Sequence, residues 1–168
     1  MLASASAFTH FDSHGRVRRI LHRLKYKGDR AAGLELGRLM ALDIRSSARF
    51  ASVDRLMAVP LHRRKIRQRG YNQSEILVAG MREVTNSEEV HEGLLRVVRT
   101  PSQTRKGRLD RWRNVKEAFQ LHDTSLLAGH HVLLVDDVVT TGATLESCIH
   151  VLAQVPDIRI SVYTAACA

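Results

Sequence analysis

VLLVDDVVTTGAT, residues 132–144, places two adjacent carboxylates at the end of an apolar run. The run Val132–Val135 predicts a buried strand. Asp136 and Asp137 then follow, although Asp is a poor strand residue and two neighbouring carboxylates repel each other. The pattern therefore indicates that a group outside the chain requires these two side chains.

The residues after the acids favour a ligand that carries a phosphate. In open α/β sheets, ligands gather at the carboxyl ends of strands. Residues 140–144 lead into a predicted helix, so backbone N–H groups, threonine hydroxyls and a helix N-terminus converge there. Two carboxylates suit a vicinal diol or a hydrated divalent cation. A sugar phosphate carries both a diol and a phosphate, so it would suit both parts of this stretch. An isolated Asp-Asp pair, in contrast, would more often only form a turn and cap the following helix.

The patterns outside this stretch alternate between helix and strand. Helices are predicted over 17–24, from a cap at Asp29, from a capping box at Asn72 and Glu75, and along 145–152. Strands are predicted at 55–59, near 94–98, at 132–135 and at 158–162. This alternation predicts an α/β fold with a mostly parallel central sheet flanked by helices. We expect one domain over residues 1–168.

The composition predicts a protein that attracts anions. The 168 residues include 26 Lys and Arg against 17 Asp and Glu, a formal net charge of +9. Nucleic acids, nucleotides and polyphosphates all fit this charge, which does not choose among them. Two cysteines, Cys148 and Cys167, are too few for a disulfide framework and indicate a reducing, cytoplasmic setting. The sequence contains no apolar run approaching 18 residues, which argues against a membrane span.

Two basic stretches lie between these elements. Residues 59–75 read VPLHRRKIRQRGYNQSE and form a basic loop in this interpretation, directly after a predicted strand. A charge run by itself is more often a solvated face, but this density of cations also suits a pyrophosphate. Residues 99–114 are polar and basic without an apolar period, so we expect an extended, mobile loop.

VLLVDDVVTTGAT resembles the 5-phosphoribosyl 1-pyrophosphate (PRPP) binding motif of type I phosphoribosyltransferases. In that family the two acids bind the ribose hydroxyls and the following loop cradles the 5′-phosphate. The resemblance implies a type I phosphoribosyltransferase fold. The PRPP-binding residues that it implies are Asp136, Asp137, Val138, Val139, Thr140, Thr141, Gly142, Ala143 and Thr144.

The stretch at 59–75 resembles the pyrophosphate loop of the same enzymes, and in particular the ComF family. The chain also matches that family in LKYKGD at 24–29 and in the spacing of Gln103, Arg111, Asn114, Ala118 and Phe119. The resemblance implies pyrophosphate binding by Leu61, His62, Arg63, Arg64 and Lys65. It implies a flexible loop that closes over the substrate, with Gln103, Arg105, Lys106, Arg108 and Arg111.

The implied reaction transfers the phosphoribosyl group to a nitrogen nucleophile and releases pyrophosphate, with Asp136, Asp137 and Arg63 as the catalytic residues. Mg²⁺ is the implied cofactor, held at Asp136 and Asp137 through water and the ribose. The alternative is a non-catalytic protein of this fold that acts in DNA uptake or nucleic-acid-linked regulation. The partners expected are PRPP, an unidentified acceptor, and DNA or competence proteins, and a homodimer remains open.

ComF-like proteins usually carry an N-terminal cysteine-rich module that binds zinc. This sequence has no cysteine before Cys148. We therefore expect either that this member lacks the module or that the chain begins after it.

Overall fold

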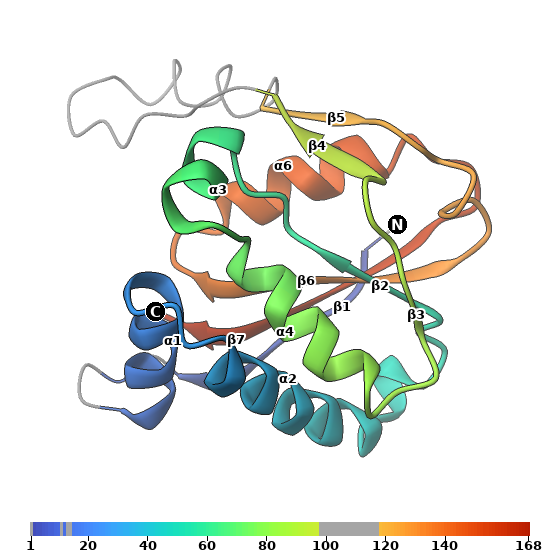
Figure 1. Cartoon of the computed structure of the whole chain (residues 1–168). Coiled ribbons are helices and arrows are strands. Elements are labelled where there is room, and N and C mark those ends of the chain that lie inside the picture. Colours follow the sequence, from blue (N-terminus) through green and yellow to red (C-terminus); the bar gives the residue numbers. More distant parts are fainter. Residues whose placement is uncertain (1, 11, 13–14, 98–117) are drawn as a thin grey trace.

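A five-stranded parallel sheet forms the centre of the protein (Figure 1). The computed structural model describes residues 2–10, 12, 15–97 and 118–168. In spatial order the strands are β1 (Leu2–His10), β7 (Arg159–Cys167), β6 (His131–Val139), β2 (Arg55–Ala58) and β3 (Glu88–Glu89). A separate antiparallel pair joins β4 (Leu94–Arg96) to β5 (Phe119–Leu121). The predicted α/β fold with a mostly parallel sheet is confirmed.

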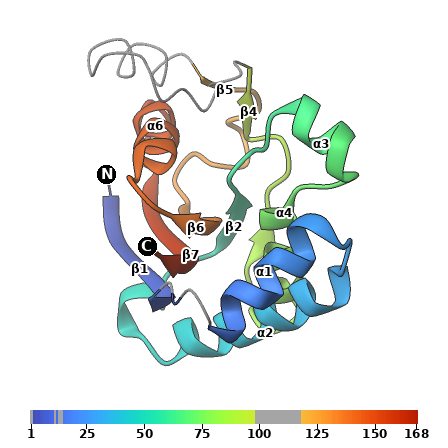
Figure 2. The same ribbon diagram turned by 90° about the vertical axis from the view of Figure 1, so that its left-hand side faces the viewer.

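Helices cover both faces of the sheet (Figures 1 and 2). One face packs against α1 (Arg16–Tyr26), α2 (Arg30–Arg45) and α4 (Gln73–Arg82), and the other against α6 (Ala143–Leu152) and the β4–β5 pair. Strand β6 serves both layers, because Val132 and Leu134 join the α6 core while Leu133 and Val135 join the α4 core. This burial on two sides explains why the strand is apolar without alternation.

Two helix boundaries follow the predicted caps. The side chain of Asp29 accepts a hydrogen bond of 3.1 Å from the backbone N–H of Ala32 at the start of α2. The side chain of Asn72 accepts one of 3.1 Å from the N–H of Ser74 at the start of α4. Gly28 lies between α1 and α2 with φ of 68°, a conformation that glycine adopts without strain.

Helices α2 and α4 approach each other unusually closely at two glycines. A β-carbon on Gly37 would lie 2.2 Å from the carbonyl oxygen of Leu77, and one on Gly80 would lie 2.1 Å from that of Leu34. Because a side chain at either position would collide with backbone, only glycine allows this helix spacing. This close contact holds α4 in position against α2, and the first turn of α4 borders the candidate site.

The structure corrects three expectations from the sequence. The basic stretch after β2 is largely the helix α3 (Arg63–Arg69) rather than a loop, since Arg, Lys and Gln favour helix and His62 caps it. Strand β1 was not predicted, and β6 and β7 run several residues beyond their predicted ends. A short 3₁₀ turn, η1 (Ala48–Phe50), precedes β2.

No helix in the described part of the chain is long and apolar enough to cross a membrane.

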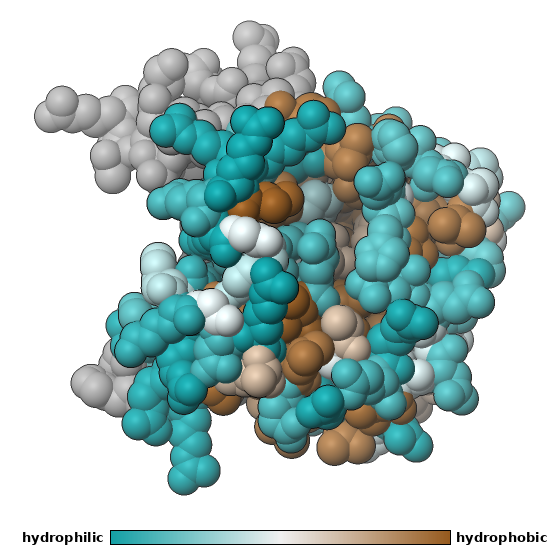
Figure 3. Space-filling view, viewed as in Figure 1, coloured by the Kyte–Doolittle hydropathy of each residue, from teal (hydrophilic) through white to brown (hydrophobic). Residues whose placement is uncertain are grey.

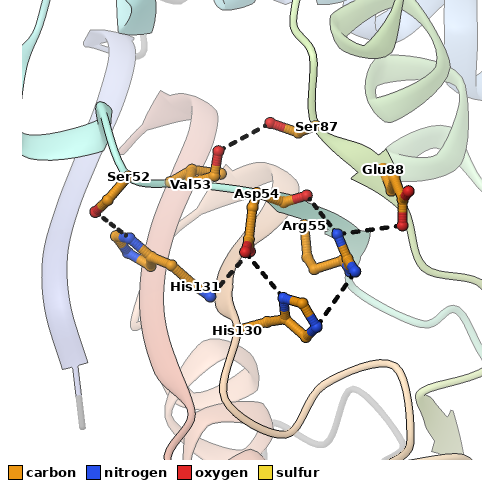
Figure 4. A network of polar contacts seen from close by, with 8 residues as sticks. All are labelled: Ser52, Val53, Asp54, Arg55, Ser87, Glu88, His130 and His131. Atoms are coloured by element: carbon orange, nitrogen blue, oxygen red, sulfur yellow. Dashed lines mark hydrogen bonds and ion pairs between the residues drawn. The ribbon is translucent and has the colours of Figure 1, made fainter.

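A polar network joins the amino ends of β2 and β6 (Figure 4). The carboxylate of Asp54 accepts a hydrogen bond of 3.0 Å from the backbone N–H of His131 and lies 2.9 Å from Nδ1 of His130. The His131 ring lies between the hydroxyls of Ser52 and Ser161, at 2.8 and 2.9 Å. These contacts set the register of β2 against β6, and therefore which residues meet at the other ends of both strands.

Candidate functional site

Two acidic side chains, Asp136 and Asp137, lie in the C-terminal half of β6, towards the carboxyl edge of the sheet. Oδ1 of Asp136 accepts hydrogen bonds of 3.0 Å from the hydroxyl of Ser74 and 2.8 Å from the N–H of Asp137. Oδ2 of Asp137 lies 2.5 Å from Nζ of Lys25, at the end of α1. The carboxylates therefore lie where the sequence predicts a ligand, between the start of α4 and the end of α1.

The surroundings of the acid pair raise the pKa of one of its two carboxyl groups, that of Asp136. Burial, followed by the nearby charge of Asp137, raises the pKa of Asp136 to about 7. The hydrogen bond from Ser74 and the charge of Lys25 oppose this rise. At neutral pH the Asp136 carboxyl group is therefore divided between a form that only accepts hydrogen bonds and a form that also donates one, and both forms can pair with a hydroxyl.

The segment after the acids forms an open helix N-terminus. Gly142 has φ of 76° and precedes α6, and among the described residues no side chain caps this end of the helix. Thr140 and Thr141 are exposed beside it. The first N–H groups of α6 and the positive end of its dipole therefore lie next in the chain to two exposed threonines. This arrangement can bind a phosphate group.

Among the basic residues of α3, Lys65 feels the charge of the acid pair. Loss of solvation lowers the pKa of Lys65, as do the charges of Arg69, Arg96 and Lys25, whereas the charge of Asp137 raises it. Lys65 is therefore within electrostatic reach of the acid pair. Nδ1 of His62 accepts a hydrogen bond of 3.2 Å from the N–H of Arg64 and so caps α3.

Arg63 and Arg64 are exposed and line a separate groove of about 680 Å³. The groove runs between α3 and residues 89–97, and its wall does not include Asp136 or Asp137. In Figure 3 the surface is hollowed beside α3, where hydrophilic side chains border hydrophobic ones. The residues that line the groove include Leu61, Arg63, Arg64, Ile66, Arg67, Glu75, Leu95 and Arg96. The structure thus brings Lys65 towards the acids, while the two arginines border this groove.

The predicted flexible loop contains five more of the expected site residues. Gln103, Arg105, Lys106, Arg108 and Arg111 belong to the expected loop at 99–114, and this loop lies outside the described residues.

The acid pair fits a magnesium ion only together with a substrate. Among the described residues, no three His, Cys, Asp or Glu side chains come close enough to hold a metal ion by themselves. Mg²⁺ is commonly bound through one or two carboxylates together with substrate phosphates and water. Asp136 and Asp137 are the two carboxylates of such a donor set, and a phosphorylated ligand and water would have to complete it.

Two residues of the site were not predicted from the sequence. The pattern places Ser74 only within a capping box, and Lys25 only within the LKYKGD match. Because both contacts join residues far apart in the chain, no local periodicity reports them. The only signal available was the position of Lys25 inside a stretch that matches a known family.

Comparisons with known proteins identify the family of the chain. The family described as "Phosphoribosyl transferase domain" matches residues 53–165. "DNA utilization protein YhgH" of Escherichia coli (strain K12) is 32% identical over 138 residues, which cover 80% of this chain and 60% of that protein. "Competence protein F" of Haemophilus influenzae is 29% identical over 148 residues, covering 86% of this chain and 65% of that protein. The chain thus spans less than two thirds of these relatives.

A solved structure shares the fold. The structure described as the allosteric regulatory enzyme of purine biosynthesis superposes with a TM-score of 0.54 at 18% identity. The match covers 81% of this chain and 26% of that chain. At this identity the likeness concerns the fold alone.

Proposed function

The chain belongs to the phosphoribosyl transferase domain family, and from that premise we propose that it binds PRPP and transfers its phosphoribosyl group to a nitrogen nucleophile. The relatives named competence protein F and YhgH confirm the resemblance to the ComF family. One observation carries the proposal. The Asp136–Asp137 pair lies in the C-terminal half of β6, and the chain then enters α6 (Ala143–Leu152), whose N-terminus no described side chain caps.

Each part of PRPP has a matching part of the site in this proposal. The ribose diol pairs with Asp136 and Asp137, and the 5′-phosphate binds the N–H groups and hydroxyls of residues 140–144. The pyrophosphate lies towards α3, where Arg63, Arg64 and Lys65 supply positive charge.

The reaction needs positioning and charge stabilisation more than a reactive side chain. A nitrogen lone pair of the acceptor forms a bond to C1 of PRPP, and the bond from C1 to the pyrophosphate oxygen breaks with its electron pair leaving on that oxygen. The acceptor loses its N–H proton to solvent or to the departing pyrophosphate. The cations of α3 stabilise the charge that develops on the leaving group, and the two carboxylates hold the ribose in place. Mg²⁺, when bound at Asp136 and Asp137 with PRPP, would neutralise part of the same charge.

Thermal melting with PRPP and Mg²⁺ tests the binding step. A ligand that binds only the folded state stabilises it, by about 2.7 kcal/mol when its concentration is 100 times its dissociation constant. We expect a higher melting temperature for the wild type, and no shift for a variant with both Asp136→Asn and Asp137→Asn. An equal shift in the double variant would contradict the role of the two acids. Release of pyrophosphate with a panel of nitrogen acceptors then tests the transfer step.

A second candidate function is DNA handling without catalysis. It is favoured by the names of the relatives, which refer to DNA utilization and competence. It is also favoured by the exposed cations of α1, which are Arg16, Arg18, Arg19 and Arg23. Salt-dependent binding to DNA in the absence of PRPP turnover would support this function over the first one.

The proposed location is the cytoplasm. Cys148 and Cys167 are both free, and burial raises the pKa of the Cys148 thiol well above its usual range. Free thiols are compatible with a reducing compartment.

A further inference from the structure

The end of α1 reaches the acid pair from a part of the chain that lies outside the matched family domain. Lys25 precedes the matched residues 53–165, yet its Nζ lies 2.5 Å from Oδ2 of Asp137. The two side chains are 24% and 14% exposed, so most of this ion pair is shielded from solvent. The contact brings an additional charged residue into the candidate site.

Several other contacts hold the end of α1 in place. Leu21 and Leu24 are buried in the core that α1 shares with α2 and α4. The hydroxyl of Tyr71 donates a hydrogen bond to the carbonyl oxygen of Leu24. Arg23 also forms an ion pair of 2.5 Å with Asp29, at the start of α2. The helix end is therefore fixed by packing and by polar contacts that do not involve Lys25.

The ion pair between Lys25 and Asp137 could either dock α1 on the sheet or serve the candidate site. If it served only to dock α1, the other contacts of the helix end would make it redundant. An ion pair screened from water also costs desolvation free energy, which the attraction between the charges often only offsets. Lys25 is shielded from solvent, is not needed to dock α1, and pairs with a carboxylate of the candidate site. These three facts together indicate that Lys25 has a role in that site.

We propose that Lys25 is a positioning residue of the phosphoribosyl site, whose ammonium group orients the Asp137 carboxylate for the ribose diol. The inference rests on the proposed binding of PRPP. It extends the site beyond residues 53–165 to the end of α1. Lys25 also brings a positive charge to this edge of the sheet. The charge comes from α1, an element that is distant in sequence from the basic helix α3.

Substitutions that keep the side-chain stem isolate the charge. Lys25→Met retains an unbranched chain without the ammonium, and Lys25→Arg retains the positive charge. Lys27→Met is the matched control, because Lys27 is exposed and immediately follows α1. The measurements are the dissociation constant of PRPP in saturating Mg²⁺ by calorimetry, and the melting temperature of each free protein.

We expect Lys25→Met to weaken PRPP binding about 10- to 100-fold, the range typical for one lost hydrogen bond to a charged group. Lys25→Arg should restore most of the affinity, Lys27→Met should bind as the wild type does, and the free proteins should melt at similar temperatures. A purely structural role would instead lower the melting temperature of free Lys25→Met together with its affinity, because the loss of the ion pair with Asp137 would then loosen the fold itself.

Four results would overturn the inference. Wild-type affinity in Lys25→Met would remove Lys25 from the site and leave the proposed function intact. Equal weakening by Met and Arg, or loss of the fold in Lys25→Met, would make the residue structural. Absence of PRPP binding by the wild type would overturn the proposed function, and the role of Lys25 with it.

Discussion

The hydroxyl of Ser74, in the first turn of α4, donates a hydrogen bond of 3.0 Å to Oδ1 of Asp136, at the end of β6. The bond joins a helix start to a strand end across the sheet edge. In the same turn, Nδ2 of Asn72 donates a hydrogen bond of 3.0 Å to the carbonyl oxygen of Val59, directly after β2. The start of α4 is therefore tied to both strands that border the candidate site, and its cap residues also orient an acid of that site.

Ser74→Ala should weaken PRPP binding without unfolding the protein. The substitution removes the hydroxyl that orients Asp136, and hydrogen bonds to charged groups typically contribute about 1.5–3 kcal/mol. Asn72 remains available to cap α4. Calorimetric titration with PRPP and Mg²⁺ measures the loss. Ser87→Ala is the control, since Ser87 donates to the carbonyl oxygen of Val53 at the other end of β2. Unchanged affinity in Ser74→Ala would show that Asp136 does not need this bond.

The stability of the ligand-free, metal-free protein should fall as pH rises from 5 to 8 because of Asp136. Its pKa is raised from 3.8 to about 7 in the folded protein, so the folded state holds a proton that the unfolded state releases. The resulting stabilisation is fully present below pH 3.8 and is lost as pH rises through 7, on the order of a few kcal/mol. Asp136→Asn should remove this part of the pH dependence and be more stable than the wild type at pH 8. Urea unfolding at several pH values measures both proteins, and parallel curves would contradict the raised pKa.

The sequence predicts the parts of the fold that local physical chemistry controls. The apolar run of β6 and the caps at Asp29 and Asn72 depend on neighbouring residues, and all three are confirmed. β1 reads LASASAFTH, which has few strand-favouring residues, and it forms because the edge of β7 offers backbone partners. The Ala–Ser alternation in this stretch has period 2, but such small residues predict a strand only weakly.

The candidate site shows the same division. The positions of Asp136 and Asp137 at a sheet edge follow from the strand pattern. Their contacts with Ser74 and Lys25 depend on how α1 and α4 pack, which only the structure reveals. The prediction of a loop after β2 was wrong, because a dense charge run is typical of a solvated segment although its residues also favour helix.

Gly37→Ala should destabilise the protein more than Gly33→Ala, although both lie in α2. In each case alanine gains about 1 kcal/mol of helix propensity over glycine. The new β-carbon at 37 would lie 2.2 Å from the carbonyl oxygen of Leu77, whereas at 33 it meets the flexible ends of Ile76 and Leu24 at 2.8 Å. We expect a cost of about 1–3 kcal/mol or more at 37, because backbone must move. Denaturant unfolding measures both, and equal stabilities would contradict the close helix contact.

Arg63 and Arg64, replaced together by Ala, should weaken binding of PRPP and of pyrophosphate by about 1.5–3 kcal/mol for each charged hydrogen bond removed. Both arginines are exposed in the first turn of α3, which follows the carboxyl end of β2, and they line the groove beside that helix. The matched variant replaces Arg16 and Arg18 on the exposed face of α1 by Ala, which removes the same charge from the protein. Calorimetry with each ligand should show weaker binding only in the first variant.

The same two variants separate the enzyme from the DNA-binding candidate, because the two functions place the important cations on different helices. If α1 binds DNA phosphates, replacing Arg16 and Arg18 should lower the slope of log affinity against log salt by about 0.9 for each duplex phosphate that the variant no longer neutralises. If α3 binds the pyrophosphate, that variant should retain PRPP affinity, and the α3 variant should lose it whatever happens to DNA. Titrations with PRPP, duplex DNA and single-stranded DNA over a range of salt concentrations measure both effects. Tight PRPP binding by the variant lacking Arg63 and Arg64 would contradict the assignment of these two arginines to the pyrophosphate, and would leave Lys65 as the basic residue of α3 to be tested next.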